Sequence, residues 1–167
     1  MAKTLGYMIT WTTYGTWLQG DKRKYVKDGE ILLPNKNLVN ANTKALTKDP
    51  VQLSFNQLKI VEKAVLHKAT QFGQRIYALS VGAKHVHLVA EYVPRPIGIV
   101  VQRYKSCALR ALRKDGIQGR IWTTGFNKRY CFDTNTLQIK INYVNNHRKK
   151  YLALPSTPTF SSGSGRV

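Results

Sequence analysis

The chain has 167 residues and a formal net charge of +19, from 27 Lys and Arg against 8 Asp and Glu. Hydrophobic residues make up 43% of it, which is enough for one folded domain with a core and excludes wholesale disorder. The charge indicates a polyanionic partner, with nucleic acid ahead of a membrane surface. No apolar run approaches the ~18–20 residues of a membrane span. The first residues lack a signal-peptide core, and Cys107 and Cys131 lack metal-binding or redox spacing, so we expect a cytoplasmic protein with reduced thiols.

The first half of the chain contains one predicted strand, a long loop and one predicted helix. Leu5–Thr13 is rich in β-branched and aromatic residues, which is typical of a strand. Residues 18–53 are mostly polar and predict a long loop containing a small hairpin, because Asp28-Gly29 separates two short apolar runs. Ser54–Gln57 has the form of a capping box, and apolar residues then recur at helical spacing up to Phe72.

The second half continues the alternation of strands and helices. Its predicted elements are strands at Ile76–Val81 and Val86–Val93, a helix from Pro96 to Asp115, an extended segment at Ile121–Phe132 and a helix from Thr134 or Thr136 to Tyr151. The order β-α-β-β-α-β-α is that of a ferredoxin-like split βαβ fold with one extra C-terminal helix. We therefore expect a single α+β domain over residues 1–152, with an antiparallel sheet and helices on one face, and a flexible tail at 153–167.

Two histidines, His85 and His87, stand two residues apart at the start of the third predicted strand. Alternate residues of a strand share a face, so both imidazoles project together while Val86 points into the core. Two neutral imidazoles on one face are half of a divalent-metal site. The other interpretation is two polar residues on a solvated sheet face, and the pair alone does not decide between them.

The last predicted helix offers a third ligand and a nucleophile. Tyr143 and His147 are four residues apart and therefore share one face of that helix. Tyr143 lies about 100° from the apolar stripe, at a boundary position from which a side chain reaches both the protein and a bound ligand. The alternative makes Tyr143 a flanking core aromatic and His147 a basic surface residue. The fourth histidine, His67, falls off the apolar stripe of its helix, which predicts a surface position.

These features together resemble a known family. The H-x-H pair on a strand, the tyrosine on a late helix and the ligand candidate four residues later resemble the Y1 transposases, the HUH transposases that act on single-stranded DNA. Within that group, the segments Trp11–Leu18, Arg120–Phe126 and Tyr143–His147 resemble the REP-associated tyrosine transposases most closely. The resemblance covers residues 5–151.

The resemblance implies a role for each candidate. His85 and His87 are expected to hold a divalent metal, Mg²⁺ or Mn²⁺, with His147 where the family usually has Gln or Asn, a change that favours Mn²⁺. Tyr143 is expected to attack single-stranded or hairpin DNA and form a 5′-phosphotyrosine intermediate, leaving a free 3′-hydroxyl. The family also implies a bacterial or archaeal protein associated with the nucleoid. It leaves open whether the chain acts as a monomer or a homodimer, and what residues 18–53 do.

Basic residues near these motifs predict the surface that binds DNA phosphates. They lie on the second helix, before the last helix and directly after His147: Arg103, Lys105, Arg110, Arg113, Lys128, Arg129, Arg148, Lys149 and Lys150. Four aromatic side chains are candidates for stacking on unpaired bases: Tyr14, Trp17, Trp122 and Phe126. For all four the alternative is ordinary core packing, which is equally open for Trp122.

Two other functions are compatible with the sequence. An RRM-like module that binds nucleic acid without catalysis has the same element order, but it places aromatic residues where this chain has His85, His87 and Glu91. A metal-dependent nuclease in which water replaces Tyr143 fits the same motif. Covalent capture of DNA distinguishes the three functions.

Overall fold

A four-stranded antiparallel sheet with the order β4-β5-β1-β6 forms the centre of the molecule. The computed structural model describes residues 3–15, 25–27, 30–32 and 50–153. The strands of the sheet are β1 (Gly6–Thr12), β4 (Ile76–Val81), β5 (His85–Glu91) and β6 (Asn127–Cys131). Three helices of the described residues accompany it: α2 (Phe55–Phe72), α3 (Ile97–Lys114) and α4 (Thr134–Ala153). The strand order is that of the split βαβ arrangement, so the expected α+β fold with an extra C-terminal helix is confirmed.

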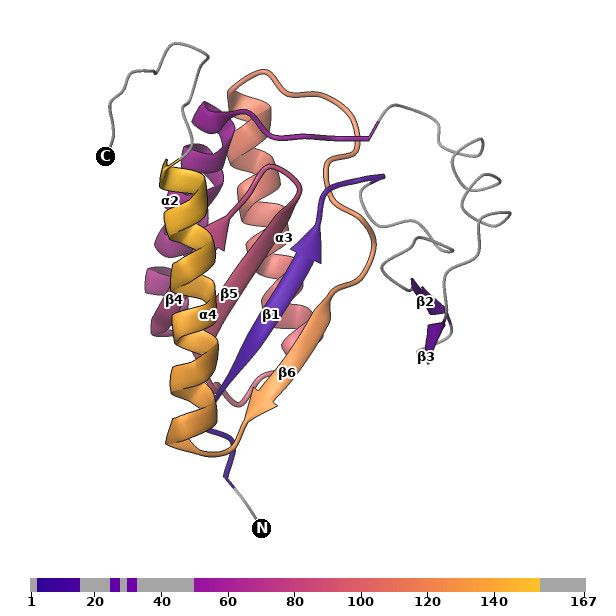
Figure 1. Cartoon of the computed structure of the whole chain (residues 1–167). Helices are drawn as coiled ribbons and strands as arrows, with labels where there is room; N and C mark the ends of the chain where they lie inside the picture. Colours follow the sequence, from indigo (N-terminus) through magenta and orange to yellow (C-terminus); the bar gives the residue numbers. More distant parts are fainter. Residues whose placement is uncertain (1–2, 16–24, 28–29, 33–49, 154–167) are drawn as a thin grey trace.

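The two crossover helices and the last helix lie on opposite faces of the sheet (Figure 1). On the α2 and α3 side, the core contains Tyr7, Ile9 and Trp11 from β1. These are alternate residues of the strand, and alternate side chains of a strand point to the same face of the sheet. On the other side, Val144 of α4 packs against Ala78 and Val89 in a smaller core. The face that a ligand can reach is therefore partly covered by α4, over β4 and β5.

Local signals in the sequence set the ends of α2. The Ser54 side chain accepts a hydrogen bond from the Gln57 amide at 3.2 Å, and the Gln57 side chain accepts one from the Ser54 amide at 2.8 Å. This is the predicted capping box, which satisfies amides that the first helical turn leaves unpaired. Gly73 ends the helix in the left-handed conformation, with φ of 69°.

The predicted hairpin within residues 18–53 is present as β2 (Tyr25–Lys27) paired antiparallel with β3 (Glu30–Leu32). Its turn and most of the rest of that region lie outside the described residues, as do Trp17 and the tail at 154–167. The end of the region is fixed to the sheet, because the Val51 amide donates to the Tyr14 carbonyl and the Leu53 amide to the Ala83 carbonyl.

The segment predicted as extended over residues 121–132 is only partly a strand. β6 occupies its last part, while Trp122 makes a single bridge to Thr13 and the residues between form a loop. Lys105 of α3 anchors that loop, because its ammonium donates to the carbonyls of Thr123 and Gly125 at 2.8 and 3.0 Å. Among the helices of the described ranges, none has the length and apolar character needed to cross a membrane.

Candidate active site

β5 presents His85 and His87 on the sheet face that α4 covers. Val86, between them, is fully buried in the core on the α2 and α3 side. The two imidazole rings lie with their centroids 4.8 Å apart. The sequence prediction that alternation places both histidines on one face and Val86 behind them is therefore confirmed.

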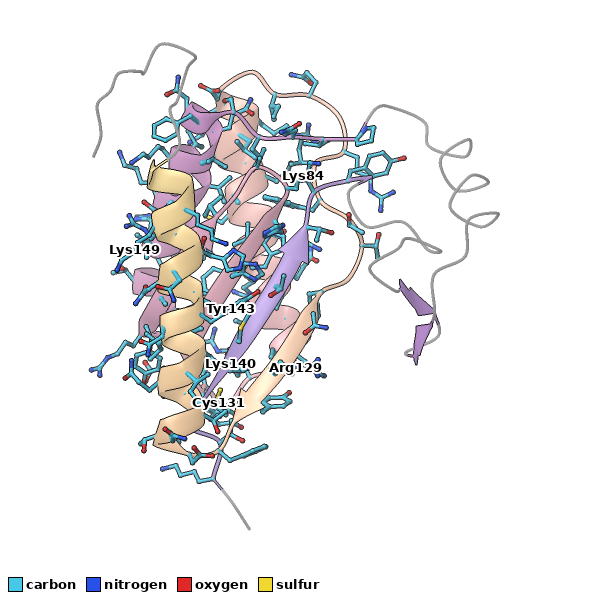
Figure 2. The ribbon with its side chains drawn as sticks, in the orientation of Figure 1. Lys84, Arg129, Cys131, Lys140, Tyr143 and Lys149 are labelled. Atoms are coloured by element: carbon cyan, nitrogen blue, oxygen red, sulfur yellow. The ribbon has the colours of Figure 1, made fainter. Side chains whose placement is uncertain are left out.

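α4 brings His147 and Tyr143 to the same place. The His147 ring centroid lies 4.7 Å from that of His87 and 6.0 Å from that of His85. Tyr143 lies one helical turn earlier, with its ring centroid 5.7 Å from His87 and 4.7 Å from His147. Val144, beside it, is fully buried, whereas Tyr143 remains 46% exposed, which is the boundary position expected for it. Figure 2 shows Tyr143 near the middle of α4, next to the sheet.

The three histidines have the geometry of a cation site. One potential ligand atom from each of His85, His87 and His147 lies within 4.8 Å of the other two. Imidazole nitrogens that bind one metal ion at about 2.0–2.1 Å lie roughly 3.0–3.4 Å from one another. Small side-chain rotations therefore suffice to bring all three nitrogens to bonding distance of one ion. We call these residues the histidine triad.

The protonation state of the triad also fits a metal. Burial lowers the pKa of His87 to about 3, with smaller contributions from His85 and His147. The pKa of His147 is lowered by burial and then by the nearby Lys150. Thr10 shares a 2.8 Å hydrogen bond with Nδ1 of His87. If the Nδ1 hydrogen is donated to that hydroxyl, Nε2 of a neutral imidazole keeps the lone pair that a metal needs.

A row of polar side chains crosses the sheet at the level of His87. The strand register places Asn127 of β6 opposite Thr10, Thr10 opposite His87, and His87 opposite Ser80 of β4. The Ser80 hydroxyl is buried and has no hydrogen-bond partner among the described residues. The sequence analysis missed Thr10, Asn127 and Ser80, because only the register of paired strands brings them beside the histidines.

The predicted basic residues do not form one surface: one of them is buried, and the others are exposed or partly exposed on different sides of the sheet. Lys105 was expected on an exposed edge, but it is buried and anchors the loop described above, so that expectation is wrong. The three arginines of α3 are exposed on the side of the sheet opposite the triad: Arg103, Arg110 and Arg113. Lys128 and Arg129 are exposed on β6, and Figure 2 shows Lys149 of α4 pointing away from the sheet.

Arg148, directly after His147, connects α4 to α2. Its Nε lies 3.1 Å from Oε2 of Glu62, and a second guanidinium nitrogen donates to Oε1 at 3.4 Å. This partly exposed pair holds the end of α4 beside the edge strand β4. Arg148 therefore already has a protein partner, which the sequence did not indicate.

Two of the four aromatic side chains expected to stack on bases are in the core, and Trp17 lies outside the described residues. Tyr14 and Trp122 are buried, with the Trp122 ring 6.0 Å edge-to-face from Trp11, so the core alternative is correct for them. Phe126 is partly exposed. His67 is exposed, as expected.

No protein-family model and no curated protein matches the sequence. Among solved structures, the fold matches a REP-associated tyrosine transposase bound to a REP hairpin with a TM-score of 0.53 and 13% identity, over 90% of this chain and 70% of that one. The chain is similar in fold to a REP-associated tyrosine transposase. The resemblance seen in the sequence is thereby confirmed at the level of the fold. A chain from Deinococcus radiodurans, provisionally described as a transposase, matches over 88% of this chain and 93% of that one at 17% identity. Its TM-score of 0.44 is too low to support an inference.

Proposed function

We propose that the chain is a metal-dependent transposase that cleaves and rejoins single-stranded or hairpin DNA through Tyr143. The observation that carries this proposal is the convergence of His85, His87 and His147 with Tyr143 one helical turn from the last of them. Three imidazoles gathered at this distance, His87 buried and the other two half-buried, have little structural use without a cation. A half-exposed tyrosine in ring contact with two of them is placed to reach a bound phosphodiester.

The chain's own residues account for the proposed steps. When bound at the triad, Mg²⁺ or Mn²⁺ supplies positive charge that neutralises a scissile phosphate and makes its phosphorus more electrophilic. The Tyr143 oxygen then forms a bond to phosphorus while the bond from phosphorus to the 3′-oxygen breaks. The phenol proton ends on that 3′-oxygen, which leaves a 5′-phosphotyrosine and a 3′-hydroxyl. Attack by another 3′-hydroxyl reverses the step and joins strands without a nucleotide cofactor.

The transposase proposal is favoured over the two other functions that the sequence allows. An RRM-like module needs an open sheet face with aromatic residues, whereas here that face carries the triad and is partly covered by α4. A nuclease that uses water gives no reason for a tyrosine ring 4.7 Å from a triad histidine. The DNA of the REP-associated transposase, a REP hairpin, supports hairpin DNA as a substrate class to test.

Trapping of a covalent intermediate tests the proposal. The wild-type chain, incubated with a labelled single strand and Mn²⁺, is expected to form an adduct that survives denaturation, and Tyr143→Phe is expected to form none. Tyr151→Phe is the matched control, since Tyr151 also lies four residues from His147 on the helix. An adduct that persists in Tyr143→Phe would refute the assignment. Cleavage without any adduct would favour water as the nucleophile, and binding without cleavage would favour a module without catalysis.

A further inference from the structure

Three aromatic side chains lie exposed at the end of the sheet away from the histidine triad. Tyr92, Tyr130 and Phe132 are 45%, 40% and 51% exposed. The rings of Tyr130 and Phe132 lie 6.4 Å apart and are inclined by 32° to each other. We call these three residues the aromatic row. Large aromatic side chains are normally the most buried part of a core, so three half-exposed rings at one end of a sheet indicate a contact surface.

The aromatic row is a different surface from the active site. Tyr130 stands opposite Tyr7 and packs edge-to-face on it at 6.2 Å, and Tyr7 belongs to the core on the α2 and α3 side. Tyr92 joins the same end of the sheet, because its amide donates to the Leu5 carbonyl and the Leu5 amide donates to that of Cys131. β6 connects the two surfaces: it begins at Asn127, beside Thr10 and the triad, and ends at the aromatic row.

The charge around the aromatic row favours a polyanion. The ammonium of Lys128 lies 5.8 Å from the centre of the Tyr130 ring. Arg129, between these two residues in the sequence, is exposed on the opposite face of β6. Two nearby carboxylates accept hydrogen bonds from backbone amides: Glu91 from that of Arg75, and Asp133 from that of Thr136.

A second copy of the chain fits this surface less well than a nucleic acid. β6 is the edge strand of the sheet, and pairing two such edges would bring the cations Lys128 and Arg129 of both copies together. Lysine on an edge strand is a recognised obstacle to such pairing. A single-stranded nucleic acid instead offers phosphates to the cations and flat bases to the rings.

We propose that the aromatic row is a second nucleic-acid contact, on which unpaired bases of a single strand stack beyond the position that is cleaved. The role as an extension of the substrate site rests on the proposed function, whereas binding of a single strand does not. The five residues of β6 span about 17 Å at 3.4 Å each, so a strand that leaves the triad and passes over the β6 edge needs only a few nucleotides to reach the row.

Binding of a single strand without cleavage tests the proposal. The probe is a labelled oligothymidylate of about 20 nucleotides, longer than the usual site of one binding module, in buffer with EDTA so that no metal supports chemistry. The double variant Tyr130→Ala with Phe132→Ala is expected to bind at least about tenfold more weakly in fluorescence anisotropy. Tyr130→Phe keeps the ring and is expected to bind like the wild type, whereas Tyr130→Leu keeps apolar bulk without the ring and is expected to bind weakly.

Matched controls separate stacking from a general loss of surface hydrophobicity. Leu66→Ala and Ile139→Ala remove exposed apolar side chains on α2 and α4 and are expected to leave affinity unchanged. Unchanged affinity in the double variant overturns the proposal. So does sedimentation showing that the same variant abolishes a dimer, since the surface would then bind a second copy. If the wild type forms no covalent adduct but the double variant still loses affinity, the aromatic row stands and the proposed transposase activity fails.

Discussion

The hydrogen bond between Thr10 and His87 gives the sharpest test of the metal site short of removing a ligand. Thr10→Val replaces the hydroxyl by a methyl group of nearly the same shape, and valine is β-branched like threonine, so β1 is expected to form as before. The substitution removes the 2.8 Å hydrogen bond to Nδ1 of His87. The imidazole then rotates and changes tautomer more freely, although all three histidines remain.

The size of the effect follows from the surroundings of the bond. Removing a partner that orients a metal-ligating histidine typically costs about 10- to 100-fold in metal affinity. A neutral hydrogen bond contributes about 0.5–1.5 kcal/mol, and tenfold in affinity corresponds to about 1.4 kcal/mol. Thr10 is partly exposed and His87 is uncharged, so we expect the lower end, about a tenfold loss.

Calorimetric titration with Mn²⁺, after removal of bound metal by a chelator, measures this loss. Thr4→Val makes the same chemical change near the other end of β1 and is expected to bind Mn²⁺ like the wild type. Equal affinities of Thr10→Val and the wild type would refute the orienting role of Thr10. An absence of Mn²⁺ binding in the wild type would refute the metal site itself.

Three further outcomes are expected. Lys105→Met removes the buried donor that two partly buried carbonyls share and should lower the free energy of unfolding in urea by about 2 kcal/mol, against less than ~0.5 kcal/mol for the exposed Lys114→Met; equal effects would contradict the anchoring role. Because the pKa of His87 falls to about 3 on folding, the metal-free protein should lose stability as pH drops from about 6.5 towards 3, by at most ~1.4 kcal/mol per pH unit, and His87→Asn should flatten this dependence measured by urea unfolding; an unchanged slope would count against it. Arg129→Glu, opposite Met8 on the face of the triad, should weaken binding of a single strand more than Arg110→Glu on α3, which packs on the other face of the sheet, and anisotropy showing equal losses would mean that the face does not matter.

The elements were predictable where the sequence carries a local signal. The capping box before α2 and the helical spacing after it identify that helix, and the turn pair Asp28-Gly29 identifies the β2–β3 hairpin. Residues 121–126 look extended because they include β-branched and aromatic residues. They form a loop because the Lys105 ammonium takes two of their carbonyls, which pairing with a strand would otherwise use. That contact spans 18 and 20 residues, so no local pattern reveals it.

The site was predictable to the extent that periodicity defines a face. Alternation along β5 brings His85 and His87 together, and the helical turn of α4 brings Tyr143 beside His147. That these two pairs meet is a property of how α4 crosses the sheet, which the sequence suggested only through a family resemblance. Lys105 shows the opposite case: its place beside arginines on α3 suggested a solvated cation, but its long side chain reaches inward to polar backbone.

The proposal that Tyr143 attacks DNA beside the histidine triad is tested most directly by locating the attached nucleotide. The covalent adduct formed with Mn²⁺ and a single strand is digested with protease and nuclease, and the peptide carrying the nucleotide is sequenced by mass spectrometry. We expect the added mass on Tyr143, joined through a 5′-phosphate, and no modified peptide from His147→Ala when the metal is limiting. A nucleotide on any other of the nine tyrosines, or cleaved DNA with no modified peptide, would contradict the account.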